Sequence, residues 1–578
     1  MPLDKQSKYM EHRSPRFAAL ICLSLATVSC SQIETPQETS NEARPNVLLI
    51  VVDDMGLADI GSFGGEIETP NLDKFAFDGV RLTNFHASPV CSVTRAMLLT
   101  GVDAHKAGLG NMAEELAPNQ VGKPGYEGEL NDRVVTLATI LKEDGYSTYM
   151  TGKWHLGMSD EASPHNRGFN KSFSMLAGGA SHFKDMRPAY APSPEIKAPY
   201  RDNGQRIEVL PETFEYSSQF FVDQMLDYMK TDAQNTATQD KPFFAYLAFT
   251  TPHWPLQAPD QAIAKYEGRY AMGYDVLRKE RLARQIDLGI LPKGTPENIA
   301  PPKALPWNEL SYGQQLNQSK AMEIYAAMID ETDVQLGRLF DYLEQTGELD
   351  NTLIIFMSDN GAEGHDLDET WPADQFPKIR QTIDESHDFS YENMGRPNSY
   401  VLYGANWARA GAPAFRLHKG FPTEGGKRVA AFMHGKGISS GRIENRYTSV
   451  IDIMPTILDY TNNSHPTDND KSSRLEAPTG SSMRELLETQ SLETYVDAGV
   501  EAGEVLGKYF VRKGDWKIIN MPAPHGTGEW QLYNIRNDIG ETTDLAQGQP
   551  DRLKDLVSEW DEYAKANGVI LPNSVSGY

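Results

Sequence analysis

The stretch Val47-Leu48-Leu49-Ile50-Val51-Val52-Asp53-Asp54 decides the fold class of this chain of 578 residues. Its first six residues are all apolar and rich in β-branched side chains, which is typical of a strand buried on both faces of a parallel sheet. Similar runs occur at residues 243–249 and 353–357, and helix-like stretches at 135–143 and 322–343 separate them. Strands that alternate with helices predict an α/β domain, in which helices cover both faces of a large mixed, mostly parallel sheet.

Two segments between these elements lack a regular pattern. Residues 184–206 have none, and residues 292–307 contain five prolines and one glycine, which interrupt any regular element. We expect both segments to be surface loops near a functional site.

The end of the chain has a different character from the rest. Residues 509–519 and 530–534 predict antiparallel strands, and residues 552–565 predict an amphipathic helix. We therefore predict a main domain at residues 44–496 and a smaller α+β subdomain with an antiparallel sheet at residues 497–578.

The composition limits the partners of the protein. The chain has 54 Lys and Arg residues against 80 Asp and Glu residues, a formal net charge of −26 at pH 7. An acidic surface disfavours nonspecific binding to DNA, RNA or anionic lipid, so we expect no nucleic-acid partner. An anionic substrate would need a local cluster of Lys, Arg and His side chains. The three cysteines are Cys22, Cys30 and Cys91, so the body of the chain has one thiol and no internal disulfide.

The first thirty residues have the composition of an export signal. Basic residues precede an apolar run at residues 17–28, which is too short to span a bilayer and has the length of a signal-peptide core. Small residues then lead to Cys30, as in bacterial lipoprotein signals. We predict a signal at residues 1–30, a lipid anchor on Cys30 and a flexible tether at residues 31–43. The protein would then be periplasmic or a membrane-anchored lipoprotein of a bacterium, with ordinary secretion as the alternative.

Carboxylate and amide side chains follow two of the predicted strands. Asp53 and Asp54 come directly after the first strand, and Asp359 and Asn360 follow the strand at residues 353–357. In open α/β sheets, ligands bind beyond the carboxyl ends of the strands. Three carboxylates and one amide carbonyl are hard oxygen ligands, which suit Ca²⁺ or Mg²⁺ better than zinc. The alternative is that each aspartate caps a helix or a turn.

Cys91 lies at the start of a predicted helix. At this position the helix dipole favours an anion and is expected to lower the pKa of the thiol. Arg95, four residues further on, is placed by one helical turn beside Cys91. A lone cysteine would otherwise be a small buried apolar residue.

Several motifs together resemble type I sulfatases of the alkaline phosphatase superfamily. Cys91-Ser92-Val93-Thr94-Arg95, followed by Ala96-Met97-Leu98-Leu99-Thr100-Gly101, resembles the first signature of that family, with Val93 where the family has Pro or Ala. Thr151-Gly152-Lys153-Trp154-His155-Leu156-Gly157 resembles the second signature. Further similar stretches are Thr251-Pro252-His253-Trp254-Pro255, Lys419-Gly420-Phe421-Pro422-Thr423-Glu424-Gly425-Gly426, Gly514-Asp515-Trp516-Lys517 and Leu532-Tyr533. The resemblance covers about residues 44–575 and is closest to bacterial arylsulfatases of the Pseudomonas type.

The resemblance implies a sulfatase that hydrolyses sulfate monoesters, such as aryl sulfates. Cys91 would be oxidised to formylglycine by a maturation enzyme, and the hydrated aldehyde would attack sulfur and later expel sulfate. One Ca²⁺ per chain would be held by four residues, which are Asp53, Asp54, Asp359 and Asn360.

The resemblance also implies roles for the basic residues. Arg95 would stabilise the aldehyde hydrate, and Lys153 and Lys419 would neutralise the sulfate oxygens. His253 is the candidate acid for the leaving group, and His155 is the candidate base for the elimination of sulfate. Two further candidates are His105, as a neighbour of the site, and His182, in the substrate pocket. Of the two nearby lysines, we prefer Lys419 to Lys427, because the family's lysine precedes the Glu-Gly-Gly.

Two other functions remain open at the level of the sequence. A hydrolase of phosphonate monoesters or phosphodiesters in the same superfamily would share most of these residues. If Cys91 is not converted, the chain would instead be a non-catalytic protein that binds sulfated glycans.

Overall fold

The computed structural model describes residues 44–302, 304–470, 472–489, 499–574 and 576. Residues 44–578 form one compact unit. The predicted signal at residues 1–30, the lipid anchor on Cys30 and the tether at residues 31–43 lie outside the described residues. The predicted boundary between residues 496 and 497 also lies outside them, so the division into two domains stays a prediction.

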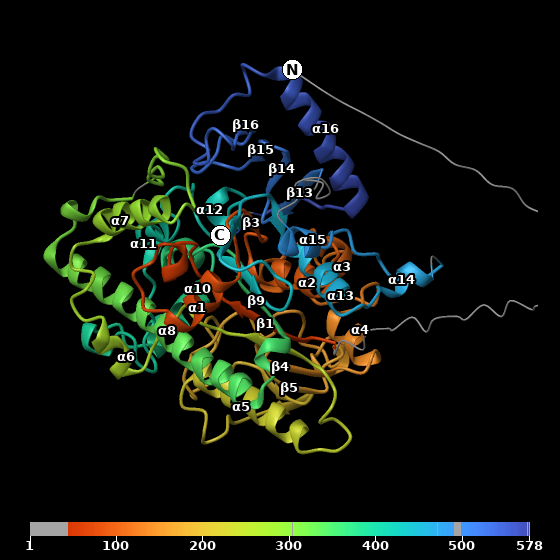
Figure 1. The fold of residues 1–578 in the computed structure, drawn as a ribbon. Coiled ribbons are helices and arrows are strands. Elements are labelled where there is room, and N and C mark those ends of the chain that lie inside the picture. Colours follow the sequence, from red (N-terminus) through yellow and green to blue (C-terminus); the bar gives the residue numbers. More distant parts are fainter. Residues whose placement is uncertain (1–43, 303, 471, 490–498, 575, 577–578) are drawn as a thin grey trace, which may run out of the picture. The chain divides into compact units, whose positions relative to one another are not determined.

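The core of the unit is a mixed sheet of ten strands (Figure 1). The strands are β1 (Asn46–Val52), β2 (Val80–Leu82), β4 (Ser147–Lys153), β5 (Lys171–Met175), β6 (Tyr200–Asp202), β7 (Gln205–Ile207), β8 (Phe243–Ala248), β9 (Thr352–Ser358), β10 (Ala431–His434) and β11 (Arg442–Glu444). Their order is β11-β2-β10-β9-β1-β8-β4-β5-β6-β7. The central block β9-β1-β8-β4-β5 is parallel, and β10, β6 and β7 add antiparallel strands on its two sides. The predicted sheet is thereby confirmed.

Strand β1 shows why an uninterrupted apolar run forms the centre of the sheet. Successive side chains of a strand point to opposite faces. Leu48, Ile50 and Val52 pack into one hydrophobic cluster, whereas Leu49 and Val51 pack into another. Both faces of β1 are therefore covered, and every residue of the run is buried.

Each face of the sheet is covered by its own helices. The first face is covered by α1 (Pro70–Asp78), α5 (Ser217–Ala233) and α8 (Tyr312–Thr346), and the second by α2 (Cys91–Thr100), α4 (Leu137–Glu143) and α13 (Ile453–Tyr460). Further α-helices are α3 (Ala104–Ala107), α6 (Asp260–Lys265), α7 (Tyr274–Asp287), α9 (Leu367–Thr370), α10 (Pro377–Ser386), α11 (Gly404–Gly411), α12 (Glu424–Lys427), α14 (Pro466–Asn469) and α15 (Arg484–Glu488). The short strands β3 (Phe85–His86) and β12 (Thr448–Ser449) pair with each other.

A second, antiparallel sheet follows near the end of the chain, as predicted. It consists of β13 (Val500–Val505), β14 (Lys508–Lys513), β15 (Trp516–Asn520) and β16 (Trp530–Asn534), and α16 (Pro550–Asn567) packs on it through Leu556 and Trp560. Figure 1 shows this sheet and α16 in blue.

The C-terminal sheet supports the segment that carries Lys419. Leu417 and Phe421, on either side of Lys419, pack against Phe510 and other apolar side chains of the sheet. Lys517, which is 1% exposed, pairs at 2.8 Å with both Glu424 and Glu541. We call these contacts the C-terminal support.

Two elements differ from the expectation. The segment 184–206, predicted to be irregular, ends in the hairpin β6–β7, whose two turn residues Asn203 and Gly204 have positive φ of 46° and 83°. Asn-Gly is the most favourable pair for such a turn, but the flanking strands have only three residues each, too few to show an alternating pattern in the sequence. Helix α8 begins ten residues before the predicted start at residue 322, because Ser311 and Gln314 form a capping box.

Among the described residues, we found no helix with the length and apolar composition needed to cross a membrane.

Candidate active site

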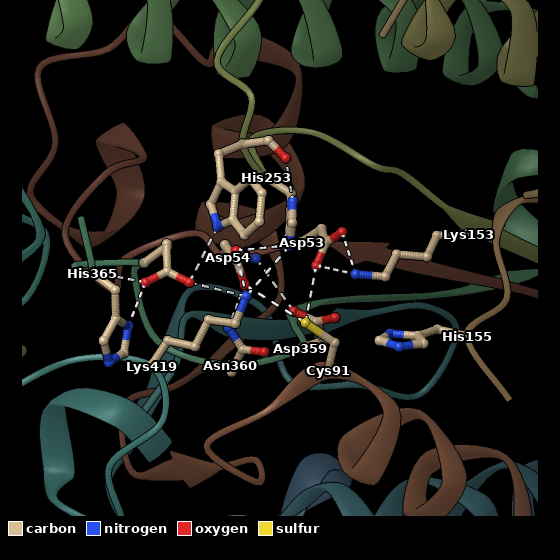
Figure 2. A network of polar contacts seen from close by, with 12 residues as sticks. Asp53, Asp54, Cys91, Lys153, His155, His253, Asp359, Asn360, His365 and Lys419 are labelled. Carbon is tan, nitrogen blue, oxygen red and sulfur yellow. Dashed lines mark hydrogen bonds and ion pairs between the residues drawn. The ribbon is translucent and has the colours of Figure 1, made fainter. Parts of the chain in front are cut away.

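The predicted site residues meet at one edge of the central sheet. Strands β4, β8, β1 and β9 are adjacent and parallel, so their carboxyl ends lie side by side. Lys153 is the last residue of β4, Asp53 and Asp54 follow β1, and Asp359 follows β9. His253 lies five residues beyond the end of β8 at Ala248. Figure 2 shows these side chains pointing toward one another.

Cys91 is brought to this edge by the first turn of α2. The helix begins at Cys91, which is 1% exposed. Its Sγ lies 3.4 Å from Asp53 Oδ1 and 3.7 Å from Asp54 Oδ1. The thiol therefore lies directly among the carboxylates that follow β1.

Arg95, one turn further along α2, connects three parts of the site. Its guanidinium donates at 2.9 Å to Asp359 Oδ2 and at 2.9 Å to the backbone oxygen of Lys153. Arg95 is fully buried, so it acts as a fixed positive charge between β9 and β4. The Lys153 ammonium in turn lies 2.9 and 2.7 Å from the two carboxylate oxygens of Asp53.

Lys419 reaches the site from the side opposite Lys153 (Figure 2). Its Nζ lies 2.9 Å from Asp54 Oδ2, 3.1 Å from Glu363 Oε2 and 3.4 Å from His253 Nε2. The His253 Nδ1 lies 2.5 Å from the backbone oxygen of Trp254, which can only accept a hydrogen bond. His253 Nδ1 therefore carries the proton, and Nε2 faces Lys419 and Asp54.

His155 lies beside the site without contacting the carboxylates. Its Nε2 lies 3.0 Å from Glu114 Oε1, and the same oxygen accepts a hydrogen bond from the Tyr190 hydroxyl at 2.7 Å. A Cβ placed on Gly178 would lie 2.9 Å from His155 Cε1, and one on Gly179 would lie 2.9 Å from His253 Cε1. Each imidazole therefore packs directly against one of these two glycines. A side chain at either position would displace the imidazole that it faces.

Burial of so many charges shifts their protonation. Burial, together with the carboxylates of Asp359 and Asp54, raises the pKa of Asp53 to about 8 against the opposing charge of Lys153. Burial also raises the pKa of Asp54. By contrast, burial is outweighed at Asp359, where Arg95 and Lys153 lower the pKa.

The thiol does not behave as predicted. The position at a helix N-terminus favours a thiolate, but burial and the nearby carboxylate of Asp359 raise the pKa of Cys91 well above its ordinary value. A dipole at a helix end contributes less than the removal of the thiolate from water next to negative charges. Cys91 is therefore a neutral thiol in this environment.

Two residues of the site have a backbone conformation that is unusual for side chains other than glycine. Asp54 has a φ of 69° and His155 a φ of 56°. Such conformations cost energy and persist where the surrounding structure fixes them, and they are frequent at functional sites. Here they turn Asp54 and His155 sharply at the ends of β1 and β4.

The additional candidates lie in different places. His182 Nε2 donates to the backbone oxygen of His253 at 2.9 Å, and its Nδ1 lies 3.1 Å from the Ser217 hydroxyl, so this imidazole supports the segment that carries His253. His105 lies between Asp103 and Glu504, apart from the strand ends. Lys427 pairs with Glu501 and lies over the ring of Phe510. Of the two lysines, Lys419 is the one that reaches the strand ends.

Two acidic residues of the site, Glu363 and Glu114, are not predicted from the sequence. Glu363 contacts Lys419 and also accepts from the Trp254 indole at 3.3 Å. Its position four residues after Asp359 was a usable signal, because it still belongs to the loop beyond β9. Glu114 lies in an irregular segment, and we see no sequence signal that identifies it as the partner of His155.

Comparisons with known proteins identify the relatives of this chain. A family model described as "Sulfatase" matches residues 45–463. The chain is 41% identical over 543 residues to an uncharacterized sulfatase of Schizosaccharomyces pombe, covering 91% of this chain and 94% of that protein. It is 40% identical over 429 residues to an arylsulfatase of Klebsiella aerogenes, covering 73% of this chain and 87% of that protein. The crystal structure of Ps i-CgsB in complex with k-i-k-neocarrahexaose has a similar fold, with a TM-score of 0.61, 22% identity and coverage of 92% of this chain and 95% of that one.

Proposed function

The chain belongs to the sulfatase family of the alkaline phosphatase superfamily and is a sulfuric ester hydrolase, and from that premise we propose how it works. We infer that it hydrolyses sulfate monoesters, such as aryl sulfates, with a formylglycine derived from Cys91 and with one Ca²⁺. The observation that carries this proposal is the position of Cys91 Sγ, 3.4 Å from Asp53 Oδ1. The thiol lies where a nucleophile would meet both a bound cation and the basic side chains.

The residues present fit a calcium ion. Asp53, Asp54, Asp359 and Asn360 are all at most 1% exposed, and they offer oxygen ligands from two adjacent strand ends. Within the described part of the chain, the side-chain oxygen of Asn360 is buried and has no hydrogen-bond partner, as expected for an atom that binds a cation. Oxygen ligands of this kind are those that Ca²⁺ prefers.

The charges also support a cation. The four carboxylates of Asp53, Asp54, Asp359 and Glu363 face the three cations of Arg95, Lys153 and Lys419, which leaves one negative charge in excess when all are ionised. This excess adds to the effect of burial, which is the main cause of the raised pKa values of Asp53 and Asp54. When bound, Ca²⁺ would supply two positive charges as a Lewis acid, which makes the site net positive and suited to the single negative charge of a sulfate monoester.

The modified Cys91 would supply the attacking hydroxyl of a hydrated aldehyde, and the side chains around it have defined tasks. Arg95, fixed by Asp359, orients position 91 from within the same helix. Lys153 and Lys419 provide ammonium groups on opposite sides of Asp53 and Asp54, where they neutralise charge on sulfuryl oxygens.

The two histidines are assigned to proton transfer. His253 presents Nε2 to the site, so this atom gives the proton to the leaving alcohol once it has been protonated. Burial lowers the pKa of His155 although the paired Glu114 opposes this shift, so the imidazole is neutral and we assign it as the base that takes a proton during the elimination of sulfate.

The first experiment is the mass of the tryptic peptide Leu82–Arg95 from the protein made in its own host. An aldehyde at position 91 gives a peptide lighter by the exchange of the thiol and one hydrogen for oxygen. An unmodified thiol in all molecules would overturn the proposed nucleophile and leave the sulfated-glycan binder as the alternative. Cys91 is 1% exposed, so we expect its conversion to occur before the chain folds.

The second experiment compares substrates. We expect turnover of an aryl sulfate that exceeds the turnover of the matching aryl phosphonate monoester and phosphodiester, and we expect none in the Cys91→Ala variant. Faster hydrolysis of the phosphonate or phosphodiester would favour the alternative hydrolase of the same superfamily. Substantial aryl sulfate turnover by Cys91→Ala would refute the role of Cys91.

We also propose that the protein is exported, that Cys30 is lipidated, and that residues 44–496 form the catalytic domain and residues 497–578 a smaller α+β subdomain. The apolar run before Cys30 and the change of pattern near the end of the chain support these proposals. Labelling with a fatty acid, lost in the Cys30→Ser variant, would test the anchor. Absence of the label from the unaltered protein would refute it.

A further inference from the structure

A cluster of two histidines and one glutamate begins at Glu363, which contacts Lys419, and extends away from the strand ends of the candidate active site. Glu363, His365 and His418 are buried, with exposed fractions of 5%, 4% and 3%. One potential ligand atom from each of the three residues lies within 4.8 Å of those from the other two. The His365 and His418 rings are 4.7 Å apart between centroids, at an angle of 86°. Figure 2 shows His365 at the end of the network that lies away from Cys91.

Both imidazoles are held in a defined orientation. His365 Nδ1 lies 2.7 Å from Glu363 Oε1, and His418 Nδ1 lies 3.2 Å from the backbone oxygen of Lys419. A carboxylate and a carbonyl oxygen accept hydrogen bonds, so each Nδ1 carries the proton and each Nε2 carries the lone pair. Metal-binding histidines are oriented in the same way, by a carboxylate or a backbone carbonyl at the nitrogen that does not bind the metal.

The cluster also has a route of access. His365 and His418 line a cavity of about 680 Å³, together with His525 from the C-terminal part of the chain. The exposed acidic residues Asp366, Asp368 and Glu369 line the same cavity. Their negative charges would attract a cation toward the two imidazoles.

We propose that Glu363, His365 and His418 form a second metal site, which binds a divalent transition-metal ion with Zn²⁺ as the expected occupant. The imidazole nitrogens of His365 and His418 bind the ion, Glu363 orients His365 and provides negative charge, and the cavity leaves room for water or a further ligand. Imidazole ligands favour Zn²⁺ and its neighbours over Ca²⁺, so this site differs in chemistry from the oxygen-lined calcium site. The proposal goes beyond the proposed function and does not depend on it.

The site can be tested by titration with Co²⁺, which replaces Zn²⁺ and has visible absorption bands. The full-length protein is purified without a polyhistidine tag, and excess Ca²⁺ is kept present to occupy the oxygen ligands. We expect one equivalent of Co²⁺ to bind, with visible bands that disappear when Zn²⁺ is added. The His418→Ala and His365→Ala variants should lose this spectrum, and Glu363→Gln should bind about 10- to 100-fold more weakly.

The control is His165→Ala. His165 is exposed, lies in the short helix His165–Arg167, and is not part of the cluster. This variant should bind Co²⁺ like the unaltered protein. Equal Co²⁺ binding by the unaltered protein and by the His365→Ala/His418→Ala double variant would overturn the proposal, as would the lack of any visible spectrum.

A second measurement covers the case in which the variants do not fold. X-ray absorption at the zinc edge of the unaltered protein, loaded with one equivalent of Zn²⁺ in the presence of Ca²⁺, reports the ligands directly. We expect the multiple-scattering pattern of two imidazoles. A spectrum with only oxygen ligands, or with a sulfur ligand from Cys91, would place the ion in the active site and refute the second site.

Discussion

Replacing Lys419 by alanine should abolish most activity, whereas the same change at Lys427 should not. The two lysines are eight residues apart, are 1% and 2% exposed, and are both paired with a glutamate. Lys419 reaches Asp54 and His253, while Lys427 pairs with Glu501 and lies 3.4 Å from the centroid of the Phe510 ring. A comparison of the two variants therefore distinguishes the effect of losing any buried charge from the effect of losing a charge in the candidate active site.

The expected magnitudes follow from the contacts. Removing one group that stabilises charge in the transition state typically lowers kcat by about 10²- to 10³-fold. The Lys419→Ala change also leaves two buried carboxylates, those of Asp54 and Glu363, without this cation, and breaking a buried ion pair costs about 3–5 kcal/mol. For a unit of this size, the unfolding entropy is about 1.1 kcal/mol per degree, so the thermal midpoint should fall by about 3–5 °C.

The assay is steady-state hydrolysis of an aryl sulfate, normalised to the fraction of chains that carry the aldehyde. Thermal unfolding of both variants is followed in the same buffer with Ca²⁺. We expect Lys427→Ala to lower the thermal midpoint while its normalised kcat stays within about threefold of the unaltered protein. If both variants lose stability to a similar extent and lose the same activity, then Lys419 acts only through stability, and its assigned role is refuted.

Three further predictions concern the cation, maturation and pH. Removal of Ca²⁺ with a chelator should lower the activity and the thermal midpoint together, because the proposed calcium-binding residues join β1 to β9. An ion that binds only the folded state stabilises that state. A chelator that changes neither quantity would contradict the metal site. Val93→Ala should raise the fraction of peptide 82–95 that carries the aldehyde, because it removes a β-branched side chain from the segment that the maturation enzyme reads; an unchanged or lower fraction would refute this effect of Val93. Hydrogen bonds and charge interactions with Asp103 and Glu504 outweigh burial and raise the pKa of His105 to about 9, above the ordinary value of 6.5. The protonated imidazole therefore stabilises the folded state fully below pH 6.5, and this stabilisation is lost as the pH rises through 9. Unfolding midpoints measured from pH 6 to pH 10 should show this loss in the unaltered protein and not in His105→Gln, and parallel curves for the two proteins would contradict it.

The central sheet could be predicted because its strands are recognisable without their neighbours. The run that becomes β1 is apolar throughout, since both of its faces pack on helices. Once a parallel sheet is predicted, the carboxylates of Asp53 and Asp359 are expected at the same edge, and the structure places them there.

Other features depend on contacts between distant segments, which local pattern does not reveal. The partner of His155 is Glu114, which lies 41 residues earlier in an irregular segment. The raised pKa of the Cys91 thiol results from burial against carboxylates of other strands, whereas the sequence indicates only the helix end. The cluster of His365 and His418 combines two loops that are separated by more than fifty residues.

The C-terminal support has a consequence for the time at which the enzyme becomes active during its synthesis. Cys91 leaves the ribosome early, whereas Lys517 and Glu541, which support the Lys419 segment, are among the last 62 residues of the chain. Until these residues have been added, the segment that carries Lys419 lacks the surface on which Leu417 and Phe421 pack. For the proposed oxidation of Cys91, the order of synthesis would provide an interval in which the thiol is accessible while the site around it is incomplete.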